Sequence, residues 1–424
     1  MKSKHLVSFL AIITGLNVSA KNAFADVIVE WQAGDNSANI QQAIDSGDSR
    51  VVIAQADEPW IIGQPLHATS PNQTILFEPG VTLKAQAGAF KGTLDSLVTI
   101  TSDNVTLSGY RATLQMRKED YADPNLYEPS PYRHLIRIKG ALNFVVEGLT
   151  LKDSGGDGII VSHSFRDDLS KPAERRFSSG IIRDVVADNN FRLGISVISA
   201  KNLLIKNSIL KNANGIKPAS GLDLEPEYDW QKLVNIRVQN TKFVNNDRNG
   251  VQIGLGKYRG PLVEDISVVF DNCTSIDNGE IGIKIQGAKT GFYDGSKGSI
   301  TFNNLQVENS GWHGIWIRND QTDPEQTYQF AFNNTKVVNS ATETGKFYPV
   351  TFWNTIAAGG ITNVDFGNDF SIVDNQNRPG VFANNHAIRD GFTNISGTIN
   401  IDNPQQLPPN LGDNLTNFNL KFTN

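Results

Sequence analysis

The chain of 424 residues contains one cysteine, Cys273, and so cannot form an intrachain disulfide. The stability of the fold must therefore come from its packed core. Cys273 follows Phe270-Asp-Asn, a context that predicts a small side chain packed inward. A catalytic thiol would need an exposed, electropositive site, so we assign Cys273 no catalytic role.

The sequence also has neither an excess of basic residues nor long apolar runs. Lysine and arginine number 38 against 44 aspartate and glutamate, and the net charge is −6. This balance argues against a nucleic-acid partner, because phosphate binding needs a concentrated basic surface. Beyond the N-terminal segment no stretch approaches the ~20 apolar residues of a membrane span. The Gly-x-Gly pairs do not open helices after strands, so we predict no organic cofactor, and a monomer is the default.

The first 25 residues have the three regions of a secretory signal peptide. Two lysines lie within residues 1–5, an apolar run covers 6–16, and Ala23-Phe-Ala25 precedes Asp26. We predict cleavage after Ala25, with Ala20 as the second choice, and a secreted or periplasmic mature protein.

One short phrase returns six times between Asp157 and Arg318. Aligned on their glycines, the phrases are 36, 27, 29, 32 and 32 residues apart, within the period range of solenoids. Only Ile, Val or Leu stand one and three residues after each glycine, so one face of each strand is apolar and is buried only when coils stack. The phrases occupy residues 157–162, 193–198, 220–225, 249–254, 281–286 and 313–318.

This pattern predicts an all-β solenoid, a single-stranded parallel β-helix of roughly ten to twelve coils. Asparagine and glycine tolerate the left-handed backbone that its corners require. Residues 35–44 have the polar start and apolar spacing of a short helix that caps the first coil. The predicted organisation is a signal peptide (1–25), an N-terminal strand and helical cap (26–60), the β-helix (61–385) with loop insertions near 116–134 and 164–177, and a C-terminal tail or cap (386–424).

The repeat, the asparagine-rich corners and the capping helix resemble the secreted right-handed parallel β-helix proteins of the pectate-lyase-like superfamily, over about residues 30–370. The segments 154–159, 193–202 and 221–226 are similar to bacterial β-helix proteins grouped with lyases of alginate and of biofilm exopolysaccharide. The resemblance implies a sugar chain lying in a groove along the outward face of one sheet. It also implies a polysaccharide lyase that cleaves an acidic, uronate-containing exopolysaccharide by β-elimination.

The outward positions of the repeated strands carry the candidate catalytic groups. Asp223 and Glu225 stand two apart on one strand, so they share a face about 6.6 Å apart. Since coils stack ~4.8 Å apart, we expect the Asp223 column to continue through Gln252, Lys284 and Trp316, and the Glu225 column to contain Gln286 and Arg318. Arg192 and Arg248, each two residues before its glycine, flank the acidic coil.

A uronate lyase must neutralise the sugar carboxylate, remove the adjacent proton and support the departing 4-oxygen. We assign Lys284 as the leading base, and Arg192, Arg248 and Arg318 to the acid group. Ca²⁺ is the cofactor considered, with Asp223, Glu225 and Glu227 as its ligands or as substrate contacts. The better-known metal motifs of the superfamily are absent from this chain.

Two alternatives remain open at this stage. Asp223 and Glu225 also meet the lower bound of the about 6.5–9.5 Å that separates acid and base in inverting glycosidases. The chain would then be a hydrolase. A non-catalytic carbohydrate-binding matrix protein is the other alternative. Trp312, Trp316 and Tyr258 would suit sugar stacking under all three hypotheses.

Several further residues are weaker candidates. His163 can donate a proton near the groove, although a single histidine at a turn is more often solvated. His313, at the start of its strand, has the same two interpretations, and Asp157 is expected to bond within its own turn. The insertion at 116–134 either walls the groove or decorates the surface. The predicted substrate-binding residues are Arg133, His134, Arg248, Gln252, Tyr258, His313 and Trp316.

Overall fold

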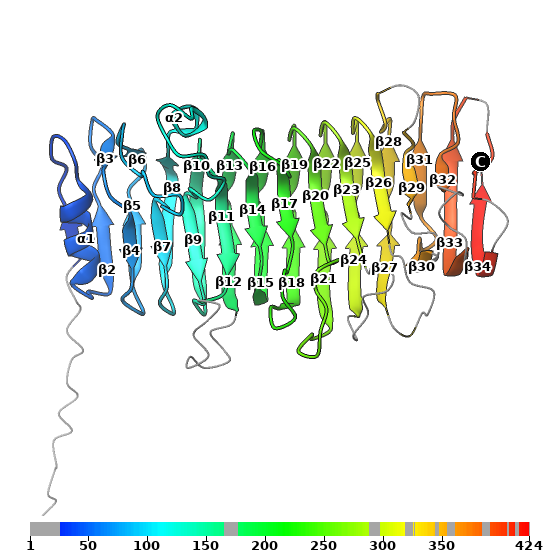
Figure 1. Cartoon of the computed structure of the whole chain (residues 1–424), viewed down its shortest axis with the longest axis horizontal. Coiled ribbons are helices and arrows are strands. Elements are labelled where there is room, and N and C mark those ends of the chain that lie inside the picture. Colours follow the sequence, from blue (N-terminus) through cyan, green and yellow to red (C-terminus); the bar gives the residue numbers. More distant parts are fainter. Residues whose placement is uncertain are drawn as a thin grey trace, which may run out of the picture.

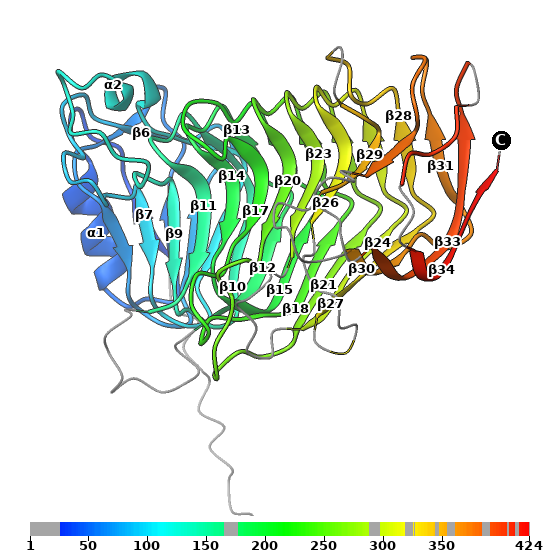
Figure 2. The same ribbon diagram turned by 45° about the vertical axis from the view of Figure 1, so that its right-hand side comes forward.

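Coil follows coil along one axis, in the order of the sequence, from the N-terminal helix to the last strand (Figure 1). In each central coil one strand belongs to an eleven-stranded sheet and two belong to a 23-stranded sheet that continues around the coil (Figure 2). The computed structural model describes residues 26–164, 177–287, 297–318, 325, 327–343, 347–353, 361–383, 391–404, 407–411 and 415–423.

The eleven-stranded sheet contains all six repeated phrases. Its neighbouring strands pair in parallel, and the described coils match the predicted number and the predicted single-stranded β-helix. In order, the strands are β4 (Leu66–Ala68), β7 (Val98–Ile100), β9 (Ile136–Lys139), β11 (Asp157–Ser162), β14 (Leu193–Val197), β17 (Ser220–Leu224), β20 (Asn249–Gly254), β23 (Ile281–Gln286), β26 (His313–Arg318), β29 (Val350–Phe352) and β32 (Val381–Ala383).

The 23-stranded sheet consists of two parallel series joined by long strands that span both. The first series is β1 (Val27–Val29), β2 (Arg50–Ile53), β5 (Thr74–Phe77), β8 (Thr106–Gln115), β10 (Phe144–Lys152), β12 (Ser178–Arg183), β15 (Ala200–Lys206), β18 (Leu233–Gln239), β21 (Ile266–Asp271), β24 (Gly298–Asn303), β27 (Tyr328–Asn333), β30 (Ile361–Asp365), β33 (Phe392–Asp402) and β34 (Leu415–Thr423). The second is β3 (Trp60–Ile62), β6 (Thr82–Ala85), β13 (Val186–Asp188), β16 (Ile209–Lys211), β19 (Lys242–Val244), β22 (Thr274–Ile276), β25 (Gln306–Glu308), β28 (Lys336–Val338) and β31 (Phe370–Val373).

The core is filled by the aliphatic residues that follow each repeated glycine. All twelve are fully buried, as the alternation predicts. The glycines themselves are required by close packing, because a Cβ added to Gly250 would lie 2.6 Å from the carbonyl oxygen of Gly282 on the next coil. The same contact with the following coil recurs at Gly158, Gly194, Gly221, Gly282 and Gly314.

Asparagine ladders form the corners between strands. Asn240 has a φ of 48°, in the left-handed region, and its side-chain amide donates to Oδ1 of Asn207 on the preceding coil over 3.1 Å. Asn272 and Asn304 extend the same ladder with bonds of 3.2 and 2.8 Å. Each side-chain amide thus finds its acceptor on the neighbouring coil. The left-handed backbone predicted for asparagine at the corners is confirmed.

A helix covers the N-terminal end of the stack, and strands continue the sheet at the other end. The helix α1 (Ser37–Asp45) buries Ile40, Ala43 and Ile44 and packs against β1, β2 and β4, where the sequence predicts a capping helix. At the other end the parallel sheet continues beyond the predicted boundary at residue 385, because β33 pairs with β30 and β31 and β34 pairs along β33. The signal-peptide segment, residues 1–25, lies outside the described residues.

The insertion at 116–134 folds back against the coils. It contains the helix α2 (Lys118–Ala122), and Lys118 Nζ donates to Oδ1 of Asn189 and of Asn214 over 2.9 and 2.6 Å. Of the second insertion, residues 165–176 lie outside the described part of the chain. In that described part, neither α1 nor α2 has the length and apolar character needed to cross a membrane.

Candidate active site

One column of side chains runs along the outer face of the eleven-stranded sheet. Leu222 and Leu224 point into the core, so Asp223 between them points outward. The strand register aligns Asp223 with Gln252 on the next coil. Lys284 and Trp316 follow on the next two coils, in the predicted order. The outer column comprises Ser196, Asp223, Gln252, Lys284, Trp316, Thr351 and Phe382.

A second column starts from Glu225. Gln286 pairs with Gly254 on one side and with Arg318 on the other, as predicted. A Cβ added to Gly254 would lie 3.2 Å from Cγ of Glu225, so glycine leaves room for this carboxylate. The result is a cavity of about 120 Å³ lined by Glu225, Gly254, Gly256, Lys257, Gln286, Gly287 and Arg318.

Asp223 faces outward but is completely covered. Its exposed fraction is 0 %, and neither carboxyl oxygen makes a well-formed hydrogen bond to another described residue. Burial, and then the neighbouring Glu225 carboxylate, raise the pKa of Asp223 well above its usual range. Arg192 and the Gln252 amide offset this only in part. Burial thus favours the protonated form of the Asp223 carboxyl more than in an exposed aspartate.

Arg192, directly before β14, contacts Asp157 on the preceding coil. Its Nη1 lies 3.3 Å from Oδ2 of Asp157, which is fully buried, while the side chain of Arg192 is 15 % exposed. Burial raises the pKa of Asp157 to about 6, although Arg192 and Arg137 oppose the shift. The sequence interpretation gave Asp157 only a turn role, whereas the structure places it in a charged cluster with Arg192.

His134 is part of the same buried cluster. Its Nδ1 accepts a hydrogen bond of 2.9 Å from the backbone N–H of Asp157. Burial, with Arg137 and Arg192 nearby, lowers the pKa of His134 well below its usual range, so its 3.3 Å contact with the Asp157 carboxyl is not an ion pair. His134 is 0 % exposed, and the predicted direct contact with substrate is therefore wrong.

Lys284 lies beside the cations and acids of the neighbouring coils. Its Nζ donates to Oε1 of Gln252 over 3.3 Å. Burial, and then the nearby Arg248 guanidinium, lower the pKa of Lys284, although three carboxylates oppose the shift. Arg248 forms an ion pair of 2.9 Å with Glu280, and burial raises the pKa of that carboxyl against the effect of Arg248.

Lys284, Arg248 and Glu280 line a groove on the outer face of β23, β26, β29 and β32. Its volume is about 680 Å³. Charged groups occupy one part of its wall and aromatic rings the other, which suits a sugar chain better than a purely apolar ligand. The lining consists of Arg248, Glu280, Ile281, Lys284, Gln286, Trp312, His313, Trp316, Arg318, Phe347, Tyr348, Trp353 and Phe382.

The other two histidine candidates are neutral, and His313 is buried whereas His163 is half-buried. Burial lowers the pKa of His313 to about 4, and its Nδ1 lies 2.9 Å from the Thr351 hydroxyl at the groove wall. Burial and then Lys139 lower the pKa of His163 to about 4. His163 packs edge-on against Trp230, with ring centroids 4.6 Å apart, and is not among the residues that line the groove.

Two predicted substrate contacts have structural roles instead. Tyr258 is 1 % exposed, and its hydroxyl donates to the carbonyl of Glu264 over 2.8 Å and accepts from the backbone N–H of the same residue. Arg133 is 0 % exposed, and its guanidinium donates to the carbonyls of Phe90, Glu128 and Lys91. These side chains have turned away from solvent to satisfy loop backbone, so neither prediction holds.

The predicted calcium ligands do not form a three-carboxylate site. Glu227 is exposed and pairs with Lys257 over 3.0 Å, while Asp223 is buried. Within the described ranges no three His, Cys, Asp or Glu side chains are grouped so that they could hold a metal ion. The residues present do not fit the calcium assignment, and we derive no step through a metal.

Sequence reasoning missed several groove residues. Glu280 stands two residues before its glycine, like Arg192, Arg248 and Trp312, and that shared position was the signal available. The backbone bonds of Glu280 to Arg248 and of Trp312 to Glu280 confirm that these positions stack. The other missed residues carry no repeat signal: Phe347, Tyr348, Trp353 and Phe382.

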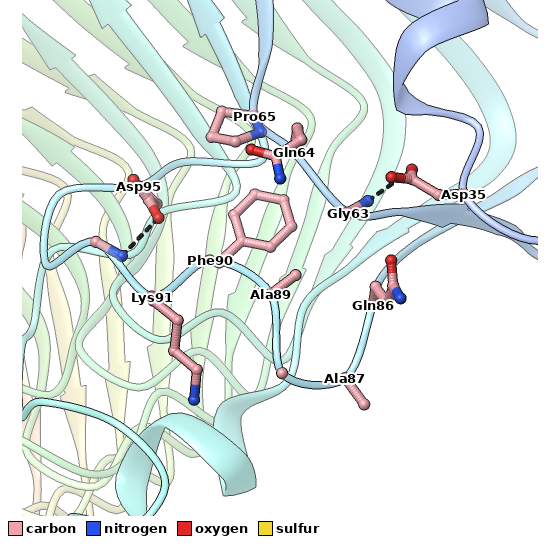
Figure 3. A pocket seen from close by; sticks show the side chains of 12 residues that line it. Asp35, Gly63, Gln64, Pro65, Gln86, Ala87, Ala89, Phe90, Lys91 and Asp95 are labelled. Atoms are coloured by element: carbon pink, nitrogen blue, oxygen red, sulfur yellow. Dashed lines mark hydrogen bonds between the residues drawn. The ribbon is translucent and has the colours of Figure 1, made fainter.

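A second hollow lies far from this groove, between the N-terminal cap and the loop at residues 86–95 (Figure 3). Asp35 there accepts hydrogen bonds from the N–H groups of Gly63 and Ser37, and Asp95 accepts one from Gly92. Both carboxylates of this hollow already accept hydrogen bonds from loop backbone, so we do not place the active site there.

Comparison with sequence families agrees with the fold. Residues 134–334 match the family model described as "Right handed beta helix region". The uncharacterized protein YclG of Bacillus subtilis (strain 168) is 26% identical over 156 residues, which cover 35% of this chain and 26% of YclG. The match thus spans about a quarter of that relative.

Solved structures of similar architecture are more distant in sequence. The A-module of the mannuronan C-5 epimerase AlgE4 of Azotobacter vinelandii has a TM-score of 0.57 at 14% identity, covering 92% of both chains. The family 28 exopolygalacturonase of Yersinia enterocolitica has a TM-score of 0.55 at 14% identity, covering 94% of this chain and 78% of that one. At these identities the likeness shows a shared fold. Fold and site define a right-handed parallel β-helix protein with a charged and aromatic groove on one sheet.

Proposed function

We propose that this chain is a polysaccharide lyase that cleaves an acidic, uronate-containing polymer by β-elimination in the groove on its outer face. One observation carries the proposal. Lys284, whose pKa burial lowers, lies in a groove that also contains the guanidinium groups of Arg248 and Arg318 and several aromatic rings. A lysine with a lowered pKa can act as a base near neutral pH.

Each of these side chains has a role in the elimination. Arg318 neutralises the uronate carboxylate, and Arg248, which pairs with Glu280 over 2.9 Å, adds positive potential beside it, so the proton at C5 becomes more acidic. Neutral Lys284 takes that proton, and the electron pair forms a C4–C5 double bond as the bond from C4 to the glycosidic oxygen breaks. The leaving oxygen then takes the proton from the Lys284 ammonium. Protons and electrons balance without another reactant.

Hydrolysis through Asp223 and Glu225 fits the site less well. An inverting hydrolase needs a water molecule between its two carboxyl groups. Asp223 is 0 % exposed, which leaves no solvent at its carboxyl for the attacking water, and its raised pKa suits a general acid but not the base that would activate this water. A non-catalytic binding protein would need the aromatic rings but not the buried lysine.

A C-5 epimerase is the second candidate, supported by the likeness in fold to the AlgE4 A-module. Epimerisation begins with the same removal of the C5 proton, and a proton then returns from the opposite face of the ring. Lyase and epimerase therefore share the proposed role of Lys284 and differ in the second step.

The test follows the fate of the C5 proton and of the chain ends. The purified protein is incubated in D₂O with alginate, pectate or an acidic bacterial exopolysaccharide. Ultraviolet absorbance of unsaturated uronides, new reducing ends and deuterium at C5 are then measured. Absorbance with new ends establishes the lyase, and deuterium without new ends establishes the epimerase. New ends with neither absorbance nor deuterium would establish hydrolysis.

Lys284→Ala should lower the elimination rate by about 10²–10⁴, the usual loss on removal of a general base. Lys242→Ala is the matched control, because Lys242 is an exposed lysine on β19, outside the groove. Equal rates in Lys284→Ala and the parent protein would refute the role of Lys284.

A further inference from the structure

The groove changes character along the solenoid axis. Its charged residues, Arg248, Glu280, Lys284 and Arg318, all belong to the coils of β20, β23 and β26. The part built on the coils of β26, β29 and β32 presents six partly exposed rings. We call these rings the aromatic bed: Trp312, Trp316, Phe347, Tyr348, Trp353 and Phe382.

Four of the six rings of the aromatic bed are stacked in pairs. Tyr348 stacks on Phe382 with centroids 4.3 Å apart and planes within 7°, and Trp312 stacks on Phe347 at 5.3 Å and 3°. Trp316 and Phe382 belong to the outer column, two coils apart, so the bed covers about 10 Å at ~4.8 Å per coil. Rigid, partly exposed rings over such a length form a preorganised apolar surface.

The six rings of the aromatic bed include no cation, and the ring N–H of Trp312 already donates to the Glu343 carboxylate over 3.1 Å. His313, beside Phe347, is neutral because its pKa is about 4. Arg378, the nearby cation, is already engaged: it pairs with Asp374 over 2.7 Å and donates to the backbone carbonyl of Phe347 over 3.2 Å. A carboxylate placed on the bed would lose its hydration without gaining a counter-charge, which is unfavourable.

We propose that the aromatic bed is a subsite for a neutral sugar with an apolar face, such as a 6-deoxyhexose, adjacent to the uronate held by Arg248 and Arg318. The preferred substrate is then a heteropolysaccharide that alternates uronate and neutral residues. In a homopolymer of uronate every residue carries a carboxylate, and one of them would have to lie against the rings. This inference rests on the proposed function, because it takes the uronate position from it.

Binding, measured by isothermal titration on the full chain, tests the subsite separately from catalysis. The probes are an alternating rhamnose–galacturonate oligosaccharide, an oligogalacturonate and an oligomannuronate of equal length. We expect the alternating probe to bind at least tenfold more tightly than either homopolymer. Trp353→Ala should weaken binding of the alternating probe about tenfold and change homopolymer binding less than twofold. The reason is that apolar contact is lost only where the neutral sugar lies.

Trp31→Ala is the matched control, because Trp31 is 36 % exposed near the capping helix at the other end of the solenoid. Trp353→Phe keeps a ring and should retain most of the binding, which separates loss of the subsite from misfolding. The inference is overturned if a homopolymer binds as tightly as the alternating probe, or if the alternating probe does not bind. A homopolymer that is cleaved in that case leaves the proposed function intact.

Discussion

Lys284 and Gln252, 32 residues apart in sequence, occupy adjacent rungs of the outer column and share a hydrogen bond of 3.3 Å from Nζ to Oε1. The amide oxygen stabilises the ammonium form of Lys284, while burial and Arg248 favour the neutral form. Gln252 therefore adjusts the pKa of the proposed base without contacting the reacting bond.

Replacing Gln252 should move the pH–rate profile. Gln252→Leu removes the acceptor, which lowers the pKa of Lys284 further and shifts the rising limb of kcat/KM to lower pH. Gln252→Glu adds a carboxylate and shifts it to higher pH. The control is Gln329→Leu, at an exposed position on β27. Profiles that coincide in all four proteins would mean that Lys284 is not the titrating base.

Asp223→Asn separates the lyase from the hydrolase. Since burial favours the protonated form of the Asp223 carboxyl, a neutral amide of similar shape should change elimination activity and the melting temperature little. A hydrolase that uses Asp223 as base would lose about 10²–10⁴ of its rate. Reducing-end assays and circular dichroism of both proteins decide between the two. A large loss in the variant with an unchanged melt would favour the hydrolase.

Asp157 should make stability fall as pH rises from about 4 to about 6. In the folded chain its pKa is about 6, above the ordinary value of 3.8, so the folded state binds more protons in this window. The free energy of unfolding then decreases by up to ~1.4 kcal/mol per pH unit. Asp157→Asn removes this contribution, so its melting temperature should rise relative to the parent across the window. His163 and His313 are present in both proteins and cancel in that difference. A difference independent of pH would contradict the assignment.

Gly250→Ala should destabilise the solenoid by about 1–3 kcal/mol, as overpacking does in tight cores. The added Cβ would collide with Ser275 Oγ and with the carbonyl oxygen of Gly282. Gly256→Ala is the control, since nothing lies within 4 Å of its added Cβ, and should stay within about 0.5 kcal/mol. Chemical denaturation measures both, and equal stability of the two variants would show that the coils yield at this contact.

The sequence predicted the strands and the order of the outer column because both depend on local features. Alternation decides which face of a strand points outward, and glycine spacing aligns the coils. That was enough to place Gln252, Lys284 and Trp316 in sequence along the outer column. It was not enough for Glu280 or Trp353, since their place in the groove depends on how corners and later coils pack.

Burial is the property that the sequence could not supply. Asp223 points outward by alternation, yet neighbouring coils cover it and raise its pKa. Tyr258 and Arg133 have the chemistry of sugar contacts, but each satisfies backbone groups of its own loop instead. The charge state of an outward residue depends on what lies above it, and that is a matter of tertiary contact.

The sequence by itself determined a stack of parallel coils with an apolar interior, since its repeated glycines and aliphatic pairs leave no other way to bury that face. The tertiary structure alone decided which polar side chains remain available to a ligand. It covers Asp157 and Asp223, lowers the pKa of Lys284 by burial, and gathers the aromatic bed from segments that share no repeat. Desolvation and proximity between distant segments set these properties, and neither is encoded in the period of the repeat.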